Sequence, residues 1–193
     1  MQVITTEIPG VVIIDPKRFQ DERGFFFETF QAERYQQYGI PTRFVQDNFS
    51  HSVKNVIRGL HYQIEHAQGK LVFVAMGKVL DVIVDIRLGS PAFGKCITIE
   101  LSSENNRQVY VPPGCAHGFC VLSDAASFVY KCTDYYYPQG ERGIIWNDSD
   151  LGIEWSTSSP LLSPKDAILP RLKNIPQEQL PRFVETESPE LFK

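Results

Sequence analysis

The chain has 193 residues, of which 42% are hydrophobic and 22% charged, and it carries a formal net charge of −4. This length can bury about 70% of the extended-chain surface, so a single domain over residues 1–193 is expected. The negative net charge argues against a nucleic-acid partner. The sequence shows no secretory signal and no apolar stretch near the roughly 20 residues that a membrane span needs. A cytoplasmic location without membrane insertion is therefore predicted.

Short β-prone runs separated by turn residues dominate the chain from its start. In chain order the predicted strands cover residues 11–14, 25–30, 43–46, 70–76, 79–87, 95–101, 108–111, 118–122 and 127–133. Gly-, Ser- and Pro-containing breaks at 77–78, 89–91 and 112–114 supply turn dihedrals between them. Many strands at this spacing indicate an all-β sandwich or barrel rather than βαβ units.

Two short helices are predicted. The first covers residues 31–38 and ends at Gly39, which is suited to a left-handed cap. The second begins after Ser163 as N-cap, with Pro164 at the first helical position. Because prolines recur from Pro160 onward, residues 160–193 are expected to wrap around the barrel as short helices and loops.

Strand alternation predicts which side chains share a face. Tyr130 and Tyr136 are an even number of residues apart and lie on one side. Asp81 belongs to an alternating set that is either a solvated face or the wall of a ligand cavity. Arg58 and His61 are out of phase, so both enter one pocket only if Gly59 forms a bulge; otherwise they are a surface arginine and a core histidine.

Two histidines, His61 and His117, are predicted to point into the barrel. A metal-binding barrel of this kind would place a second histidine where Gln63 stands, and a Cys115, His117 and Cys120 half-site does not share one strand face. The four cysteines have no CxxC spacing and are expected to be free thiols. The pattern therefore favours imidazole as a base over a metal-dependent enzyme, which stays the alternative.

An ordered set of motifs extends over roughly residues 10 to 170. The motifs are Asp21-Glu22-Arg23-Gly24-Phe25-Phe26, Phe44-Val45-Gln46-Asp47-Asn48, Arg58-Gly59-Leu60-His61-Tyr62-Gln63, Gln68-Gly69-Lys70-Leu71-Val72, Pro113-Gly114-Cys115-Ala116-His117-Gly118-Phe119, Tyr130-Lys131-Cys132-Thr133, Trp146-Asn147-Asp148 and Ser163-Pro164-Lys165-Asp166. The set resembles the dTDP-4-dehydrorhamnose 3,5-epimerase family. The resemblance implies a cupin-type jelly roll without metal or cofactor, with a few peripheral helices, that forms a homodimer exchanging strands from residues 1–30.

The implied reaction inverts carbons 3 and 5 of dTDP-4-dehydro-6-deoxy-D-glucose, both next to the ketone, to give dTDP-4-dehydro-L-rhamnose. The family match makes His61 the base, Asp166 its orienting carboxylate, Tyr130 the acid on the opposite face and Lys70 the cation near the keto oxygen. Simpler interpretations remain beside these roles: Asp166 as a helix-start acid, Tyr130 as a core aromatic and Lys70 as a strand-edge lysine.

Nine further residues match substrate-contacting positions of the family: Arg23, Glu28, Gln46, Asp47, Asn48, Arg58, His117, Tyr136 and Glu141. Arginine forks suit a diphosphate, and Tyr136 matches the aromatic that stacks on thymine. Arg23 and Glu28 are expected to reach the neighbouring subunit's pocket. Tyr62, Cys115 and the longer tail beyond Pro170 depart from the family pattern. A mono-epimerase of carbon 3 or 5 and a non-catalytic sugar-nucleotide binder are the other functional alternatives.

Overall fold

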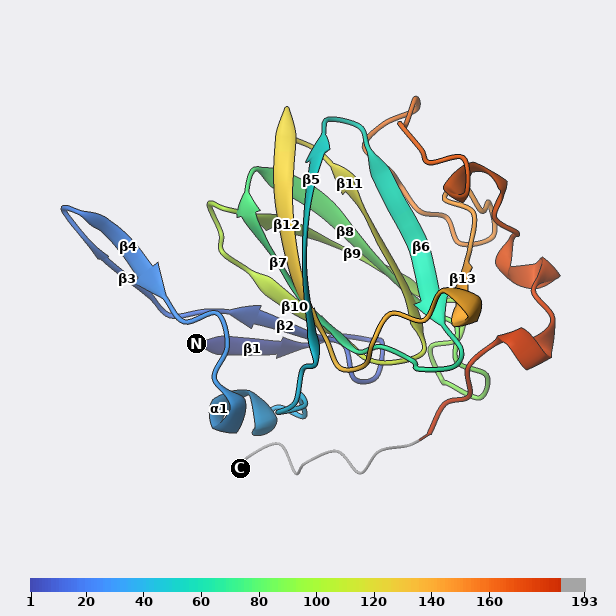
Figure 1. Ribbon diagram of the computed structural model, residues 1–193, viewed down its shortest axis with the longest axis horizontal. Helices are drawn as coiled ribbons and strands as arrows, with labels where there is room; N and C mark the ends of the chain where they lie inside the picture. The colour runs from blue at the N-terminus through green and yellow to red at the C-terminus, as the bar shows by residue number, and fades with distance from the viewer. Residues whose placement is uncertain (185–193) are drawn as a thin grey trace.

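The computed structural model describes residues 1–184 and is built from two antiparallel β-sheets that face each other (Figure 1). The six-stranded sheet has the order β1-β2-β10-β7-β12-β5, and the five-stranded sheet has the order β13-β6-β11-β8-β9. The prediction of an all-β jelly roll is confirmed. None of the described helices is long and apolar enough to cross a membrane. Residues 185–193 of the predicted wrap lie outside the described range.

The strands of the first sheet are β1 (Gln2–Thr5), β2 (Val12–Asp15), β5 (Gln46–Val53), β7 (Lys70–Met76), β10 (Gln108–Val111) and β12 (Ala125–Cys132). Those of the second are β6 (Ile57–Gln63), β8 (Lys78–Asp85), β9 (Cys96–Ser102), β11 (Cys115–Val121) and β13 (Glu141–Gly143). A separate hairpin of β3 (Arg18–Asp21) and β4 (Gly24–Phe27) projects from the barrel as an arm (Figure 1).

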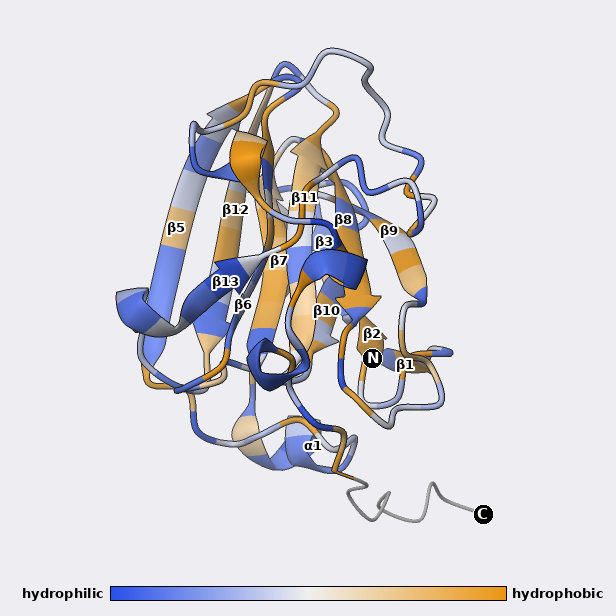
Figure 2. Ribbon diagram, turned by 90° about the vertical axis from the view of Figure 1, so that its right-hand side faces the viewer, coloured by the Kyte–Doolittle hydropathy of each residue, from blue (hydrophilic) through white to orange (hydrophobic). Residues whose placement is uncertain are grey.

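Hydrophobic residues are frequent along the strands of both sheets (Figure 2). They form one buried cluster between the sheets and further clusters on part of each outer face. The interior cluster contains Val72, Ile83 and Phe128, and the rings of Phe119 and Phe128 stack with centroids 4.4 Å apart. Outside the five-stranded sheet, Leu172, Ile175 and Leu180 of the C-terminal segment pack against the strands. The segment after Pro160 therefore covers the sheet, as predicted, because its apolar residues have this surface to bury.

The alternating residues of β8 resolve an ambiguity left by the sequence. Asp81 and Asp85 are fully buried on the same side as Val79 and Ile83, which belong to the interior cluster. This face is therefore an interior wall and not a solvated surface. Charge is tolerated there because each carboxylate is paired: Asp85 with Arg87 at 2.7 Å and Asp81 with His117 at 2.8 Å.

The structure has a bulge at Gly59, one of the two alternatives that the sequence left open. In the pairing of β6 with β11, His61 lies opposite His117 but Arg58 lies opposite Phe119, so three steps on β6 match two on β11. Gly59 has φ +115°, and a Cβ there would lie 2.7 Å from the Cα of Gly118, so only glycine fits. The bulge brings Arg58 and His61 to the same cavity.

Three predicted elements differ most from the structure, and strands β1, β3, β6 and β13 have no counterpart among the predicted ranges. Residues 43–45 are not a strand; the strand begins at Gln46 and includes a polar run that the sequence did not indicate. The first helix, α1 (Ala32–Gln36), is shorter than 31–38, although Gly39 has the expected positive φ of +76°. The second predicted helix is only a 3₁₀ turn, η2 (Asp166–Ile168), because Pro170 holds Leu169 in an extended conformation.

Three further 3₁₀ turns lie in the loops, η1 (Pro138–Gly140), η3 (Leu172–Asn174) and η4 (Gln177–Gln179). η1 directly precedes β13, and η3 and η4 belong to the C-terminal covering segment. Leu88 ties the end of that segment to the barrel, since its N–H donates to Pro181 O at 2.7 Å and its O accepts from Phe183 N at 2.9 Å.

Candidate active site

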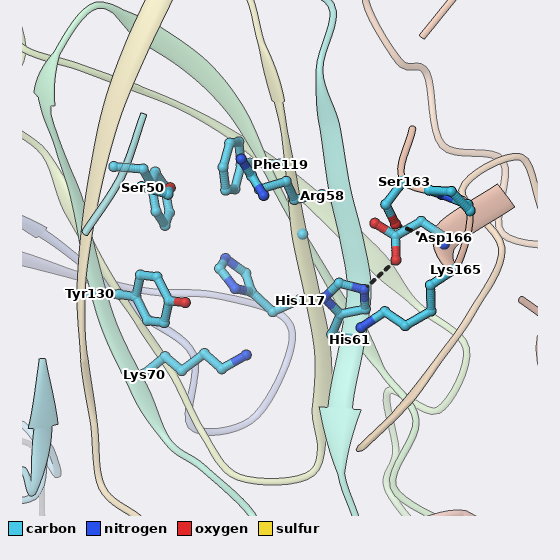
Figure 3. Close-up of a pocket in the computed structure, with 13 residues that line it drawn as sticks. Ser50, Arg58, His61, Lys70, His117, Phe119, Tyr130, Ser163, Lys165 and Asp166 are labelled. Atoms are coloured by element: carbon cyan, nitrogen blue, oxygen red, sulfur yellow. Dashed lines mark hydrogen bonds and ion pairs between the residues drawn. The ribbon is translucent and has the colours of Figure 1, made fainter. Parts of the chain in front are cut away.

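A cavity of about 620 Å³ lies between the two sheets and has the size of a small-ligand site. Six of the predicted residues line it: Arg58, His61, Lys70, His117, Tyr130 and Asp166. They come from both sheets and from the C-terminal segment, so only the folded chain brings them together (Figure 3).

His61 is held by a nearly buried carboxylate. Its Nε2 lies 2.7 Å from Oδ1 of Asp166, whose side chain is 4% exposed. Burial opposes ionisation of Asp166, but the hydrogen bonds from His61 and Ser163 outweigh it and place the pKa of this carboxyl below its usual range. Because an ionised carboxylate only accepts, Nε2 is the donor, and in the neutral imidazole Nδ1 is the nitrogen that carries the lone pair. Figure 3 shows that edge of the ring turned toward the cavity.

The structure also tests the simpler interpretation of Asp166 as an acid at the start of a helix. Its backbone N–H donates to Ser163 Oγ at 3.1 Å, the contact expected of a serine at a helix start, while its carboxylate contacts His61. The contact at the start of the turn and the contact with His61 are therefore made by different groups of one short segment.

Tyr130 and Lys70 face His61 from the opposite sheet. Tyr130 is on β12 and Lys70 on β7, whereas His61 is on β6 (Figure 3). Burial raises the pKa of Tyr130, with a further rise from Cys132, so the phenol keeps its proton at neutral pH. Burial lowers the pKa of Lys70, as expected for an ammonium withdrawn from water.

The cavity floor contains a second histidine–carboxylate pair. His117 Nε2 lies 2.8 Å from Asp81 Oδ2, and both side chains are buried. Asp81 Oδ1 and the cavity-lining Ser50 Oγ have no hydrogen-bond partner within residues 1–184. Arg58 lies nearby with its Nε donating to Ser52 Oγ at 3.0 Å, which leaves its other guanidinium N–H groups for a ligand.

An adjoining cavity of about 250 Å³ shares His61, Lys70 and Tyr130 and holds four more of the predicted residues: Gln46, Asn48, Tyr136 and Glu141. Gln46 Oε1 accepts from the Tyr136 backbone N–H at 2.9 Å, so β5 positions the aromatic loop. Gln63, at the place of the missing histidine, donates to His66 O and accepts from Tyr137 N. Its role in this structure is to fix that loop.

Lys165 is a cavity residue that the sequence did not single out. Its Nζ lies 2.8 Å from Glu141 Oε2, which also accepts from the Tyr136 hydroxyl at 3.0 Å. Burial disfavours the ionised form of Glu141, but Lys165, Tyr136 and His61 favour it and together lower the pKa of this carboxyl. The only available signal was its place beside Asp166 in the quoted motif.

Three predicted substrate contacts do not line these cavities. Arg23 is at the tip of the arm with 85% of its side chain exposed, and Glu28 binds Arg34 at 2.7 Å. Asp47 is on the outer face of β5, paired with Lys131 at 2.9 Å. Within residues 1–184, no three His, Cys, Asp or Glu side chains form a metal-binding group.

The arrangement suits removal of a proton next to a carbonyl. A hydrogen-bonded imidazole faces a phenol across the cavity, and an ammonium group lies on the phenol side to stabilise an enolate oxygen. Residues 5–174 match the sequence profile of the dTDP-4-dehydrorhamnose 3,5-epimerase family. The chain belongs to this family.

Relatives within and around the family are similar over most of their length. The dTDP-4-dehydrorhamnose 3,5-epimerase of Shigella flexneri is 56% identical over 168 residues, 86% of this chain and 93% of the relative. A dTDP-6-deoxy-D-glucose-3,5-epimerase of Legionella pneumophila, solved with dTDP-4-keto-L-rhamnose, is 54% identical with a TM-score of 0.92, covering 95% of this chain and 99% of that one. A dTDP-4-dehydrorhamnose 3-epimerase of Streptomyces niveus is 40% identical over 161 residues, 82% of this chain and 78% of the relative.

Proposed function

We propose that this protein is an isomerase that converts dTDP-4-dehydro-6-deoxy-D-glucose into dTDP-4-dehydro-L-rhamnose by inverting carbons 3 and 5. The observation that carries the proposal is the placement of His61 and Tyr130 on opposite sheets of one cavity. Inversion needs a base on one face of the sugar and an acid on the other, and these two residues supply them. The family membership specifies the sugar nucleotide.

In the proposed step, Nδ1 of His61 removes the proton from carbon 3 or 5, and the electron pair of that C–H bond becomes the enolate. The Asp166 carboxylate stabilises the imidazolium through the 2.7 Å hydrogen bond. Lys70 stabilises the negative charge on the former keto oxygen. Tyr130 then donates its phenolic proton to the opposite face of the same carbon, which completes the inversion.

The nucleotide half of the substrate is assigned to the adjoining cavity. Tyr136 offers a half-exposed ring for thymine, and Gln46, Asn48 and Glu141 offer polar contacts beside it. Arg58 and Lys165 are cations that line the sugar cavity, and they suit the diphosphate. His117, oriented by Asp81, is assigned to a sugar hydroxyl or the keto oxygen.

We also propose a homodimer in which the arm of each subunit completes the other's site. The arm exposes Phe19, Phe25 and Phe26, three rings that are 48–67% exposed, and this is more apolar surface than a free hairpin can stabilise. Arg23 at its tip would add a cation to the neighbour's diphosphate site, which explains why it lies outside the cavity of its own chain. A cytoplasmic location stays a prediction of the sequence.

The decisive experiment is incubation with dTDP-4-keto-6-deoxyglucose in heavy water, followed by NMR of the product. We expect deuterium at both carbon 3 and carbon 5 with inverted configuration. Label at one carbon only would reduce the function to a mono-epimerase, and binding of dTDP without exchange would leave a sugar-nucleotide binder. The His61→Ala variant should lose exchange and keep dTDP binding. Stoichiometric zinc, iron or manganese in active protein, with activity lost on chelation, would favour the metal-dependent alternative.

A further inference from the structure

Proton donation by Tyr130 leaves a phenolate in the cavity, and much of its surroundings opposes that charge. In the proposed step the phenolic O–H bond breaks, the proton forms the new C–H bond, and the electron pair stays on the phenol oxygen. Burial disfavours the phenolate and so raises the pKa of Tyr130. Three neighbours act in the same direction: Cys132, Glu141 and Tyr136. Arg58 acts in the opposite direction, because its positive charge favours the phenolate, so the acid step depends on where this guanidinium is held.

Arg58 reaches from the strand of the base to the sheet of the acid. Its backbone belongs to β6, as does that of His61, but its Nε donates to Ser52 Oγ at 3.0 Å. Ser52 is on β5, which pairs with β12, the strand of Tyr130. Figure 3 shows the guanidinium turned away from β6 toward the side of Ser50 and Tyr130. The contact with Ser52 therefore holds the charge on the phenol side of the cavity.

Ser52 is itself buried, with 5% of its surface exposed, and it lines neither the sugar cavity nor the nucleotide cavity. A buried hydroxyl needs a hydrogen-bond partner, and Ser52 accepts from Arg58. An arginine side chain that is held before the substrate arrives loses less entropy during the reaction, and its charge is already in place when the phenolate forms. The contact uses only the Nε–H, so the other guanidinium N–H groups stay available for the diphosphate.

We propose that Ser52 is a positioning residue for the acid step: it holds the Arg58 guanidinium on the side of Tyr130, where the positive charge stabilises the phenolate left by proton donation. Before Tyr130 acts again, the phenolate takes a proton from water and the His61 imidazolium loses one to water, so the charge of the enzyme is unchanged over the cycle. Arg58 thereby serves the acid in addition to the diphosphate. The inference rests on the proposed function, in which Tyr130 is the acid.

The test measures the fate of the enolate in heavy water. The enolate either takes deuterium back from His61, which leaves labelled substrate of retained configuration, or takes deuterium from Tyr130, which gives inverted product. The ratio of retained label to inversion is measured by NMR at saturating dTDP-4-keto-6-deoxyglucose and low conversion. Because this ratio concerns an enolate that is already bound, weaker binding of the diphosphate does not change it.

Ser52→Ala removes the contact and should raise the ratio by at least about threefold, a modest change because Arg58 is exposed and water screens its charge. Ser52→Thr keeps the hydroxyl and should restore a ratio close to that of wild type. Ser127→Ala is the matched control. Ser127 is also buried, its Oγ lies 3.0 Å from His51 Nδ1, and it lines neither cavity, so the ratio should not change.

Arg58→Gln removes the charge and decides the question if Ser52→Ala does not fold, with the same rise expected. A folded Ser52→Ala or Arg58→Gln protein with the wild-type ratio would overturn the inference. A folded Ser52→Thr protein with a ratio as high as that of Ser52→Ala would overturn it as well. Wild-type protein that exchanges no proton would instead overturn the proposed function, and a Tyr130→Phe variant that still inverts would overturn its acid assignment.

Discussion

The Asp166→Asn substitution tests the role of the carboxylate behind the proposed base. Asn has nearly the shape of Asp, so the contact with Ser163 through the backbone is kept and only the charge and the acceptor pattern change. The 2.7 Å hydrogen bond between His61 Nε2 and Asp166 Oδ1 loses its anionic acceptor. The free energy that stabilises the imidazolium during proton abstraction is then lost.

The magnitude follows from the geometry. Charge centres about 4 Å apart interact by about 4 kcal/mol at an effective dielectric constant near 20. The imidazole is 24% exposed, so solvent screening reduces this value to about 2–3 kcal/mol, or roughly 30- to 150-fold in rate. An Asn amide can also donate to Nε2 and move the ring hydrogen to Nδ1, so we expect a total loss of about 10²- to 10³-fold.

The assay is the rate of deuterium incorporation at carbons 3 and 5, with dTDP affinity measured beside it. Asp134→Asn is the matched control because Asp134 binds His66 at 3.2 Å on the surface, away from the cavities; its rate should equal that of wild type. If Asp166→Asn kept more than about a tenth of the wild-type rate with unchanged dTDP affinity, the carboxylate would not be acting on the base.

Three further predictions concern the acid, the ammonium group and the arm. Tyr130→Phe should lose inversion by about 10²-fold or more while deuterium still enters with retained configuration from the His61 face, and NMR of recovered sugar checks this. Lys70→Met should lose activity but raise the melting temperature at pH 7, because the folded state lowers the pKa of this ammonium and so disfavours its charged form. Between that lowered pKa and about 10.4 the folded wild type binds fewer protons than its unfolded chain, so the free energy of unfolding of wild type rises with pH in this range. The difference in melting temperature between Lys70→Met and wild type must therefore shrink as the pH rises. A difference that is the same at pH 7 and pH 10 would contradict this. Mixing Arg23→Ala with His61→Ala subunits should restore activity that neither variant has alone, since one site of the mixed dimer then holds both native residues; no restoration would place Arg23 outside the neighbour's site.

The sequence predicted the strands whose hydrophobic alternation is clear, but its predicted ranges missed β6 and all but the first residue of β5, two strands that line the site. β5 reads Gln46, Asn48, Ser50 and Ser52 on its inner face, and polar residues there conceal the strand pattern. The same feature explains the misplaced start at residue 43. Alternation also left Asp81 ambiguous, because its burial depends on the partner His117 from a strand more than thirty residues later.

The candidate site was predicted in part. Motifs located His61, Lys70, Tyr130 and Asp166, and the structure gathers them in one cavity. Lys165 was missed because a lysine in a proline-rich tail has no periodic signal, and its contact with Glu141 is set only by tertiary packing. Arg23, Glu28 and Asp47 do not line the cavities: Arg23 is exposed at the tip of the arm, and Glu28 and Asp47 pair with Arg34 and Lys131.

The two sheets divide the chemistry as well as the packing. Each outer face is covered by a different terminal segment, α1 on one side and the C-terminal segment on the other, so neither sheet needs its inner face wholly apolar for stability. Part of that inner face can then hold ionisable groups, with Asp81 and Asp166 each pairing a histidine. Because the proposed base and the proposed acid stand on separate sheets, each can reach only one face of a sugar held between them.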